Sequence, residues 1–400
     1  MNNDELQVLG KSYKPDKHKK WITAFFVGIA ALMALVLLGI WLYKPSANAP
    51  QNEDKESTIV PELQQAVDSL LNNELERFSD LQGQAIVMEV QTGEILAMAG
   101  RERRFDGKFQ PCENFAYQQE PGPTMMTAAL LALLETGEVK LTDEVDVQNG
   151  IWDTGEDYLM KDHNWHRGGY GKITLDRVLE VSSSIGISKT IKKVFSGKEL
   201  QYYDLLDKMC YGEPASIDGI EGLRQQRFCS PKDSTWARYM LLDNSIGYER
   251  LVAPIQTLTF YNAIANDGKM VKPTLYKNKM EVINPQIASK ESIVQMQIAL
   301  KCVVSRGLGK TAGTPLTTVA GKSGTAQVNS IEQSGDGTNT VYEYHLSFCG
   351  YFPADAPQYS IIVSLNKQGL PASGGSMAGQ VVHDIVEWMM THDKILERTK

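Results

Sequence analysis

The spacing of apolar residues divides the chain into one long apolar run near its start and a series of shorter elements after it. Over 61–78 the apolar residues recur at helical spacing, which predicts an amphipathic helix. Two short apolar segments, 85–90 and 95–99, flank a turn at 91–94 and predict a β-hairpin. Residues 125–134 are apolar on nearly every side but too few to span a bilayer, so they predict a buried core helix.

Helical and strand patterns continue to the end of the chain. The expected helices are 175–181, 255–265 and 381–390, and the expected strands are 319–328, 346–351 and 359–365. Strands at both ends with helices between them indicate one α+β domain whose sheet unites distant segments. We expect this domain to cover 61–392, after a polar linker over 44–60.

The long apolar run, Trp21 to Tyr43, contains no charged residue. At about 1.5 Å per residue it is long enough to span the roughly 30 Å hydrocarbon core of a bilayer. Lysines are frequent in residues 1–20, whereas only Lys44 follows closely, so the positive-inside rule places 1–20 in the cytoplasm. A cleaved signal peptide is the alternative, and the length of the run argues against it. The sequence therefore predicts a single-pass membrane anchor.

Charge and cysteine content exclude other classes. The chain carries 40 basic and 48 acidic residues, a net charge of −8, and shows no basic region of the kind that nucleic acid requires. Five cysteines without a C-x-x-C pair argue against a complete disulfide framework and against structural zinc, although Cys210 and Cys229 remain a candidate pair. His163 and His166 lie in a Gly-rich loop without matching carboxylates, so we expect no metal or cofactor.

Several short motifs follow one another in a recognisable order. They are MEVQTGEILAM (88–98), EPG (120–122), VSSSIG (181–186), IGYE (246–249), PIQ (254–256), ANDG (265–268) and GKSGTAQ (321–327). Together, from about residue 61 to 390, they resemble the transpeptidase domain of class B penicillin-binding proteins. The resemblance implies a β-lactamase-like fold, with an antiparallel sheet flanked by helices, a helical subdomain and an active site between them. It also implies peptidoglycan D,D-transpeptidase activity on the outer side of a bacterial cytoplasmic (inner) membrane.

The chain departs from that family at the catalytic motif. Where the family has Ser-x-x-Lys, this sequence has Pro123 at the serine position and Met126 at the lysine position. Proline has no hydroxyl, and the thioether of Met126 takes no proton at neutral pH. The resemblance also implies that the N–H groups of residue 123 and Thr325 form the oxyanion hole, and proline has no N–H. Losing one such donor typically costs about 3–4 kcal/mol of barrier. Proline nevertheless suits a first helical turn, so we expect the scaffold to be kept and the chemistry removed.

The two remaining motifs differ in how complete they are. The Ser-x-Asn motif reads Ser182-Ser183-Ser184, and the single hydroxyl of Ser184 cannot replace both groups of an amide. The Lys-Ser-Gly-Thr strand is intact: Lys322 would hold a carboxylate, and Gly324 would let a peptide lie close to the strand. The expected substrate-binding residues are Ser182, Lys322, Ser323, Gly324 and Thr325.

Two other hydroxyl groups are candidates for a replacement nucleophile. Thr124 adjoins Pro123 but has no obvious base. A literal Ser-x-x-Lys occurs at Ser364 and Lys367, on an expected strand where residues three apart point to opposite faces, so we interpret it as chance.

The first hypothesis is a membrane-anchored homologue without transpeptidase activity that acts as a structural or regulatory partner of other cell-wall synthesis membrane proteins. One alternative is an active D,D-transpeptidase with an unrecognised nucleophile. Another is a non-covalent receptor for peptidoglycan stem peptides that uses the strand at Lys322.

Overall fold

The computed structural model describes residues 56–78, 81–156, 158–225, 229–332 and 340–392. The expected cytoplasmic tail, the expected membrane segment 21–43 and most of the linker lie outside these residues. Among the residues described, no helix combines the length and the apolar character needed to span a bilayer. The compact unit begins at Glu56, inside the expected linker, and Thr58 already donates a hydrogen bond to the carbonyl of Ile95 at 2.6 Å.

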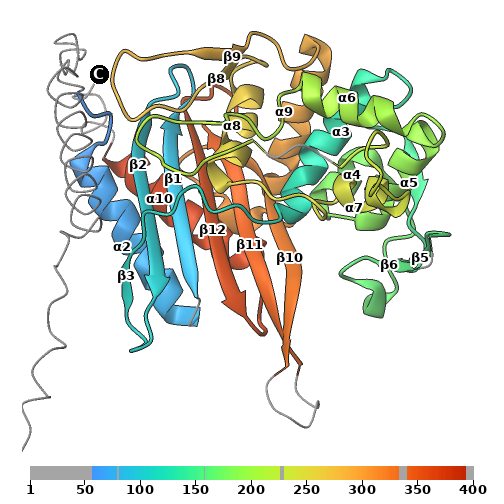
Figure 1. Ribbon diagram of the computed structural model, residues 1–400, viewed down its shortest axis with the longest axis horizontal. Helices are drawn as coiled ribbons and strands as arrows, with labels where there is room; N and C mark the ends of the chain where they lie inside the picture. The colour runs from blue at the N-terminus through green and yellow to red at the C-terminus, as the bar shows by residue number, and fades with distance from the viewer. Residues whose placement is uncertain (1–55, 79–80, 157, 226–228, 333–339, 393–400) are drawn as a thin grey trace, which may run out of the picture. The chain divides into compact units, whose positions relative to one another are not determined.

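A six-stranded antiparallel sheet forms the centre of the fold, in the order β10-β11-β12-β1-β2-β3. Its strands are β1 (Gln82–Glu89), β2 (Ile95–Arg103), β3 (Phe109–Pro111), β10 (Ala320–Glu332), β11 (Thr340–Phe352) and β12 (Tyr359–Gln368). The expected hairpin is confirmed as β1 and β2. Because β1 pairs with β12, the sheet joins segments from both ends of the domain, as the sequence predicted (Figure 1).

Nine helices are described around this sheet. They are α2 (Pro61–Phe78), α3 (Met126–Glu135), α4 (Leu175–Glu180), α5 (Ser184–Phe195), α6 (Glu199–Lys208), α7 (Tyr239–Ser245), α8 (Pro254–Ala265), α9 (Lys290–Ser305) and α10 (Gly379–Thr391). All five expected helices are present, with ends that differ by a few residues. The sequence did not predict α5, α6, α7 or α9.

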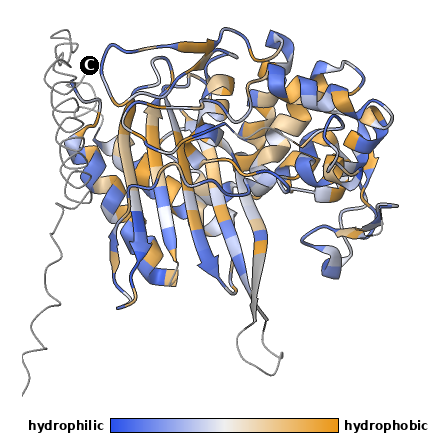
Figure 2. Ribbon diagram, in the orientation of Figure 1, coloured by the Kyte–Doolittle hydropathy of each residue, from blue (hydrophilic) through white to orange (hydrophobic). Residues whose placement is uncertain are grey.

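The sheet separates two apolar cores because its side chains alternate between faces. On β1, Ile86 and Met88 join the core that includes α3, α5 and α8, whereas Ala85 and Val87 join the core formed with α2 and α10. Figure 1 shows α2 and α10 together on one face, and Figure 2 shows hydrophobic residues throughout the strands and in α8. Burial on both faces explains why β1 appeared as an almost continuous apolar run.

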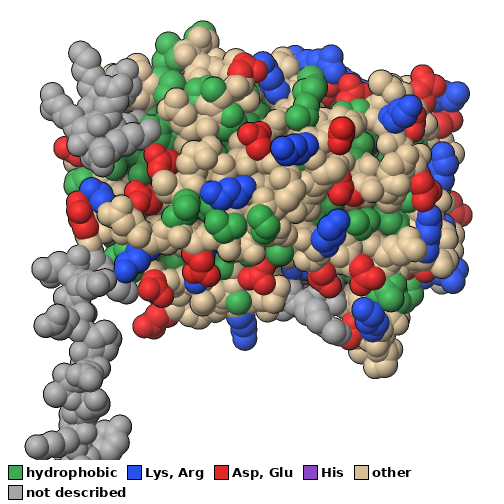
Figure 3. All heavy atoms as spheres, turned by 90° about the horizontal axis from the view of Figure 1, so that it is seen from above, with side chains coloured by type: hydrophobic (Ala, Val, Ile, Leu, Met, Phe, Trp, Pro, Cys, Tyr) green, Lys and Arg blue, Asp and Glu red, His purple; other side chains and the backbone are tan. Residues whose placement is uncertain are grey.

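Smaller strand pairs lie between the helices. They are β4 (Glu144–Asp146) with β7 (Lys172–Thr174), β5 (Ile151–Asp153) with β6 (Leu159–Lys161), and β8 (Met270–Val271) with β9 (Val282–Asn284). Figure 3 shows basic and acidic side chains interspersed on the face seen from above, so that face has no extended area of one sign.

The cysteines are free thiols. Cys210 accepts a hydrogen bond from the amide of Asn284 at 3.4 Å, and Cys229 lies 3.5 Å from the hydroxyl of Thr235. The candidate pair Cys210 and Cys229 is therefore not a disulfide in this structure.

Candidate active site

Pro123 lies in a short 3-10 turn, η1 (Gly122–Met125), and α3 begins at Met126. The N–H of Met126 donates to the carbonyl of Pro123, so the two positions are related as residues one turn apart. Gly122 has φ +56°, and a Cβ atom there would lie 2.9 Å from the Cβ of Ala326, because η1 packs closely on β10. The sequence pattern thus placed the turn correctly, and proline is accommodated at its start.

A cleft of about 500 Å³ opens beside this turn. Pro123, Ser182, Ser184, Ser323 and Thr325 all line it, so the fold brings together positions that are distant in the sequence.

The polar character of the cleft comes from hydroxyl and basic groups. Lys161 and His163 also line it, and none of the described lining residues is acidic. Burial lowers the pKa of His163, whose Nε2 atom lies 2.9 Å from the hydroxyl of Tyr170. The cleft therefore favours a neutral or anionic ligand.

Lys322 lies behind the cleft wall and is fully buried. Its Nζ atom donates to the Oγ of Ser182 at 2.9 Å and to the carbonyl of Ser323 at 2.7 Å. Burial lowers its pKa from 10.5 to about 7, because desolvation disfavours the charged form. In this arrangement Lys322 presents no charge to the cleft, and Lys161 is the lysine that lines it.

Met126 is a second buried side chain that contacts Ser182. Its side chain is fully buried, and its sulfur accepts a long hydrogen bond of 3.7 Å from the Ser182 hydroxyl. Ser182 has φ +54°, a left-handed conformation that is unusual for a serine and that turns the chain between α4 and α5. Ser182 thus contacts both Lys322 and Met126. The buried thioether of Met126 takes the position where the family has a lysine.

Ser183 and Asp162 hold the start of α5 in place. The Ser183 hydroxyl donates to a carboxylate oxygen of Asp162 at 2.6 Å and accepts the N–H of Gly186 at 3.0 Å, as an N-cap does. The other Asp162 oxygen accepts the N–H of Ile185 at 3.1 Å. Burial raises the pKa of Asp162. The sequence analysis missed this support, because it considered the three serines only as an incomplete Ser-x-Asn motif.

Gly324 and Thr124 face the interior rather than the cleft. A Cβ atom on Gly324 would lie 2.6 Å from the Ser347 hydroxyl and 3.3 Å from the carbonyl of Pro121, so neighbouring parts of the chain already use the space. The Thr124 hydroxyl is buried and donates to the same Pro121 carbonyl at 2.8 Å. Thr124 is therefore poorly placed to replace the missing serine.

The other candidate sites have structural explanations. Ser364 accepts a hydrogen bond from Gln119 at 2.6 Å, while Lys367 donates to the carbonyl of Phe78 at 3.0 Å, so the two side chains serve different contacts. Within the part of the chain that the structure describes, no group of three or more His, Cys, Asp or Glu side chains has the arrangement of a metal site.

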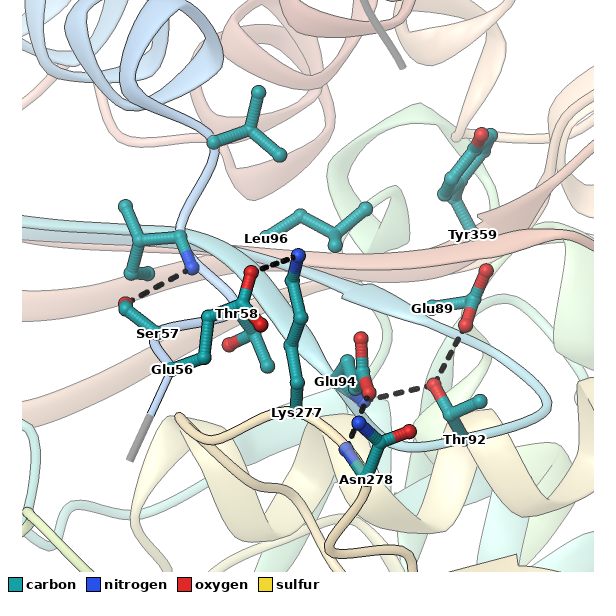
Figure 4. Close-up of a pocket in the computed structure, with 12 residues that line it drawn as sticks. Glu56, Ser57, Thr58, Glu89, Thr92, Glu94, Leu96, Lys277, Asn278 and Tyr359 are labelled. Atoms are coloured by element: carbon teal, nitrogen blue, oxygen red, sulfur yellow. Dashed lines mark hydrogen bonds and ion pairs between the residues drawn. The ribbon is translucent and has the colours of Figure 1, made fainter. Parts of the chain in front are cut away.

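A second hollow, near the start of the compact unit, is occupied by its own polar contacts (Figure 4). Lys277 contacts Glu56 at 2.6 Å, the Thr92 hydroxyl donates to Glu89 at 2.6 Å, and the N–H of Asn278 donates to Glu94. These pairings occupy polar side chains of the described lining of the hollow.

Comparison with known proteins gives the family. Residues 83–387 match the penicillin binding protein transpeptidase domain, which is more than half of the chain. The chain belongs to this family. The match spans β1, η1, the cleft and most of α10, and it confirms the class B resemblance that the motifs indicated.

Individual members of the family are similar in sequence to most of this chain. The chain is 26% identical over 377 residues to penicillin-binding protein PbpB of Mycobacterium tuberculosis, covering 85% of this chain and 53% of that protein. It is 25% identical over 328 residues to peptidoglycan D,D-transpeptidase FtsI of Escherichia coli, covering 80% and 52%. The chain thus spans about half the length of these curated relatives.

A solved structure shows the same fold. The TP domain of Burkholderia pseudomallei penicillin-binding protein 3 superposes with a TM-score of 0.70 at 25% identity, covering 86% of this chain and 98% of that one. The β-lactamase-like α+β architecture expected from the motifs is confirmed.

Proposed function

We propose that this chain acts in peptidoglycan synthesis as a penicillin-binding-protein homologue that has lost the family's acyl transfer and serves as a structural or regulatory partner of other cell-wall synthesis membrane proteins. The observation that carries the proposal is the position of Pro123 in the cleft, with Met126 buried behind it. A site for acyl transfer needs a nucleophile, a base and oxyanion donors, and these two residues supply none of them.

The proposal includes the location of the protein. Residues 21–43 would anchor it as a single-pass protein in the bacterial cytoplasmic membrane, with 1–20 inside and the transpeptidase-like domain outside. The charges interspersed on the face seen in Figure 3, and the net charge of −8 of the whole chain, fit a protein partner better than a nucleic acid.

Covalent labelling tests the loss of acyl transfer. The full chain in detergent is incubated with a reporter penicillin, and its intact mass is measured beside PbpB of Mycobacterium tuberculosis as the positive control. We expect no adduct on this chain. A stoichiometric adduct would overturn the non-catalytic proposal.

A second candidate function, acyl transfer through a different nucleophile, is favoured by one contact. Ser182 lines the cleft and lies 2.9 Å from Lys322, whose pKa of about 7 leaves a large neutral fraction that can accept a proton. An adduct that maps to Ser182 and disappears in Ser182→Ala would establish this alternative.

Non-covalent binding of stem peptides remains a third outcome of the same experiment. It is favoured by the absence of acidic groups among the described lining residues. Peptide binding without an adduct, weakened by Lys161→Ala more than by Lys322→Met, would identify the cleft as a receptor site.

A further inference from the structure

The hairpin between β2 and β3 presents a fully exposed aromatic ring. Phe105 stands at its tip, defined here as residues 104–108, with a relative exposure of 114%. The tip is held by its backbone: the N–H of Arg104 donates to Lys108 at 2.8 Å, and the N–H of Gly107 donates to Arg104 at 2.9 Å. The backbone hydrogen bonds therefore define the turn from which the ring projects, between β2 and β3 (Figure 1).

The same edge of the sheet carries a groove of about 660 Å³, which we call the edge groove. Its apolar floor includes Met98, Phe115 and Leu275, and its rim includes Glu113 and Glu221. A cavity of this size is in the range that binds apolar groups in proteins.

The charges of the two features are complementary. Arg104 and Lys108 are exposed at the tip, and Glu113 and Glu221 are exposed at the groove. Among the described residues, none of these four side chains takes part in an ion pair. Asp106 is also exposed at the tip, so the tip carries a net charge of +1 around the Phe105 ring. This charge is opposite in sign to the two carboxylates of the groove, whose lining is both polar and apolar.

The tip cannot enter the groove of its own chain. Cys112, in the groove, donates its N–H to Gly100 at 2.8 Å, which fixes its place in the ladder between β2 and β3. Three positions of β2 separate Gly100 from Arg103, about 10 Å at strand spacing, and Phe105 lies beyond the end of the strand. The occupant of the groove must therefore come from another molecule.

We propose that two copies of this chain associate by inserting each tip into the edge groove of the other copy. A twofold axis that places the two β3 strands antiparallel brings each tip beside the partner's groove, so one contact is made twice. Pro111 has no N–H and lies exposed on β3, which disfavours a continuous ladder between the two edges. The side chains of tip and groove therefore carry the contact.

Oxidative cross-linking tests this arrangement in the full chain in detergent. Phe105→Cys is exposed to a mild oxidant, and the proposal predicts a disulfide between position 105 and Cys112 of the second copy. A disulfide requires Cα atoms within about 7 Å, which excludes this linkage inside one chain. The linked peptides are identified by mass spectrometry.

Three controls fix the interpretation of the cross-link. Adding Cys112→Ser to Phe105→Cys must abolish the linked dimer. Leu370→Cys, at another highly exposed site with a relative exposure of 77%, must give no linkage to Cys112. The unsubstituted chain measures background from the native cysteines. A folded Phe105→Cys protein that stays monomeric, or that links through another cysteine, overturns the proposal.

Charge reversal provides an independent measurement. Arg104→Glu in the Phe105→Cys background should lower the cross-linking rate at least tenfold, and a further Glu221→Lys substitution should recover most of that loss. An unchanged rate in Arg104→Glu contradicts the proposed contact.

The inference deepens the proposed scaffold role and rests on it for its biological meaning. The cross-link is measured without any reaction in the cleft, so the two proposals fail separately. A penicillin adduct would overturn the non-catalytic function and leave the proposed dimer unaffected. A missing cross-link would overturn the dimer and leave the non-catalytic function unaffected.

Discussion

The Ser182 hydroxyl contacts two buried side chains, with the Nζ of Lys322 2.9 Å away and the sulfur of Met126 3.7 Å away. This contact joins strand β10 to the turn before α5 and to the first residue of α3. The lysine of the third motif is therefore part of the internal packing, and its protonation is coupled to the stability of the domain.

Lys322→Met should make stability less dependent on pH. The pKa of Lys322 falls from 10.5 to about 7 on folding, so the unfolded chain binds more protons between those values. Wild-type stability consequently rises as pH increases through that window, and the variant lacks this contribution. We expect the variant to be more stable by about 1–3 kcal/mol at pH 7, since two hydrogen bonds are lost but a buried cation is removed.

Urea unfolding of both proteins at pH 7 and pH 9.5 measures this difference. Other titrating groups act equally in the two proteins and cancel in the comparison. A stability difference that is the same at both pH values contradicts the coupling.

Ser183→Ala should destabilise the domain by about 2 kcal/mol. The substitution removes the N-cap of α5 and leaves a buried carboxylate oxygen of Asp162 without its hydroxyl donor. The matched control is Ser184→Ala, at a half-buried position whose loss should change stability by less than about 0.5 kcal/mol. Equal thermal unfolding of the two variants would show that the cap contributes little.

Gly324→Ala should cost about 1–3 kcal/mol through overpacking. Its new methyl group would meet the Ser347 hydroxyl of β11 at 2.6 Å and the Thr124 methyl group of η1 at 3.2 Å. Gly379→Ala is the control, because the nearest atoms there lie 3.6 Å away and the position is helical. Calorimetry should show a lower unfolding temperature for Gly324→Ala and an unchanged unfolding temperature for Gly379→Ala.

The double substitution Pro123→Ser with Met126→Lys should not restore acylation at the rate of an active relative. It returns the hydroxyl, the N–H and the base, but Ser184 still lacks the amide groups of the family motif, and the new lysine enters a buried space beside Lys322. Because a missing polar or acid–base group typically costs 10²–10⁴-fold, we expect labelling by a reporter penicillin at least about 100-fold slower than that of PbpB.

The comparison uses initial labelling rates of the two proteins under identical conditions. Labelling as fast as that of PbpB would mean that the serine at position 184 is an adequate replacement.

Much of the fold could be predicted because its elements carry local signals. The β1–β2 hairpin, α8 and α10 each show an apolar pattern of the right period, and tertiary packing changed only their ends. Helix α5 was missed although Ser183 caps it locally and Ile187, Ile191 and Val194 recur at helical spacing on its buried side. Only the contact with Asp162, 21 positions from Ser183, leaves no local pattern.

The sequence predicted part of the cleft lining, but Lys322 and Gly324 do not belong to that lining. The motif order placed Pro123, Ser182 and Thr325 in one site, and the structure brings them together. The burial of Lys322 could not be inferred, because a lysine in a strand is ordinarily exposed and its partner Ser182 is 140 positions away. The cation that does line the cleft, Lys161, comes from a strand of three residues with no clear sequence signal.

The pairing of β1 with β12 sets the order in which the molecule can be completed. The Ser360 hydroxyl contacts the carbonyl of Met88, 272 positions earlier in the sequence, so the first strand of the sheet stays without this neighbour until nearly the whole chain has been made. Such distant contacts slow folding and leave apolar strands open to wrong pairing in the meantime. During synthesis from the N-terminus, β1 therefore has β2 as its only strand partner, and one of its edges stays open until β12 has been made.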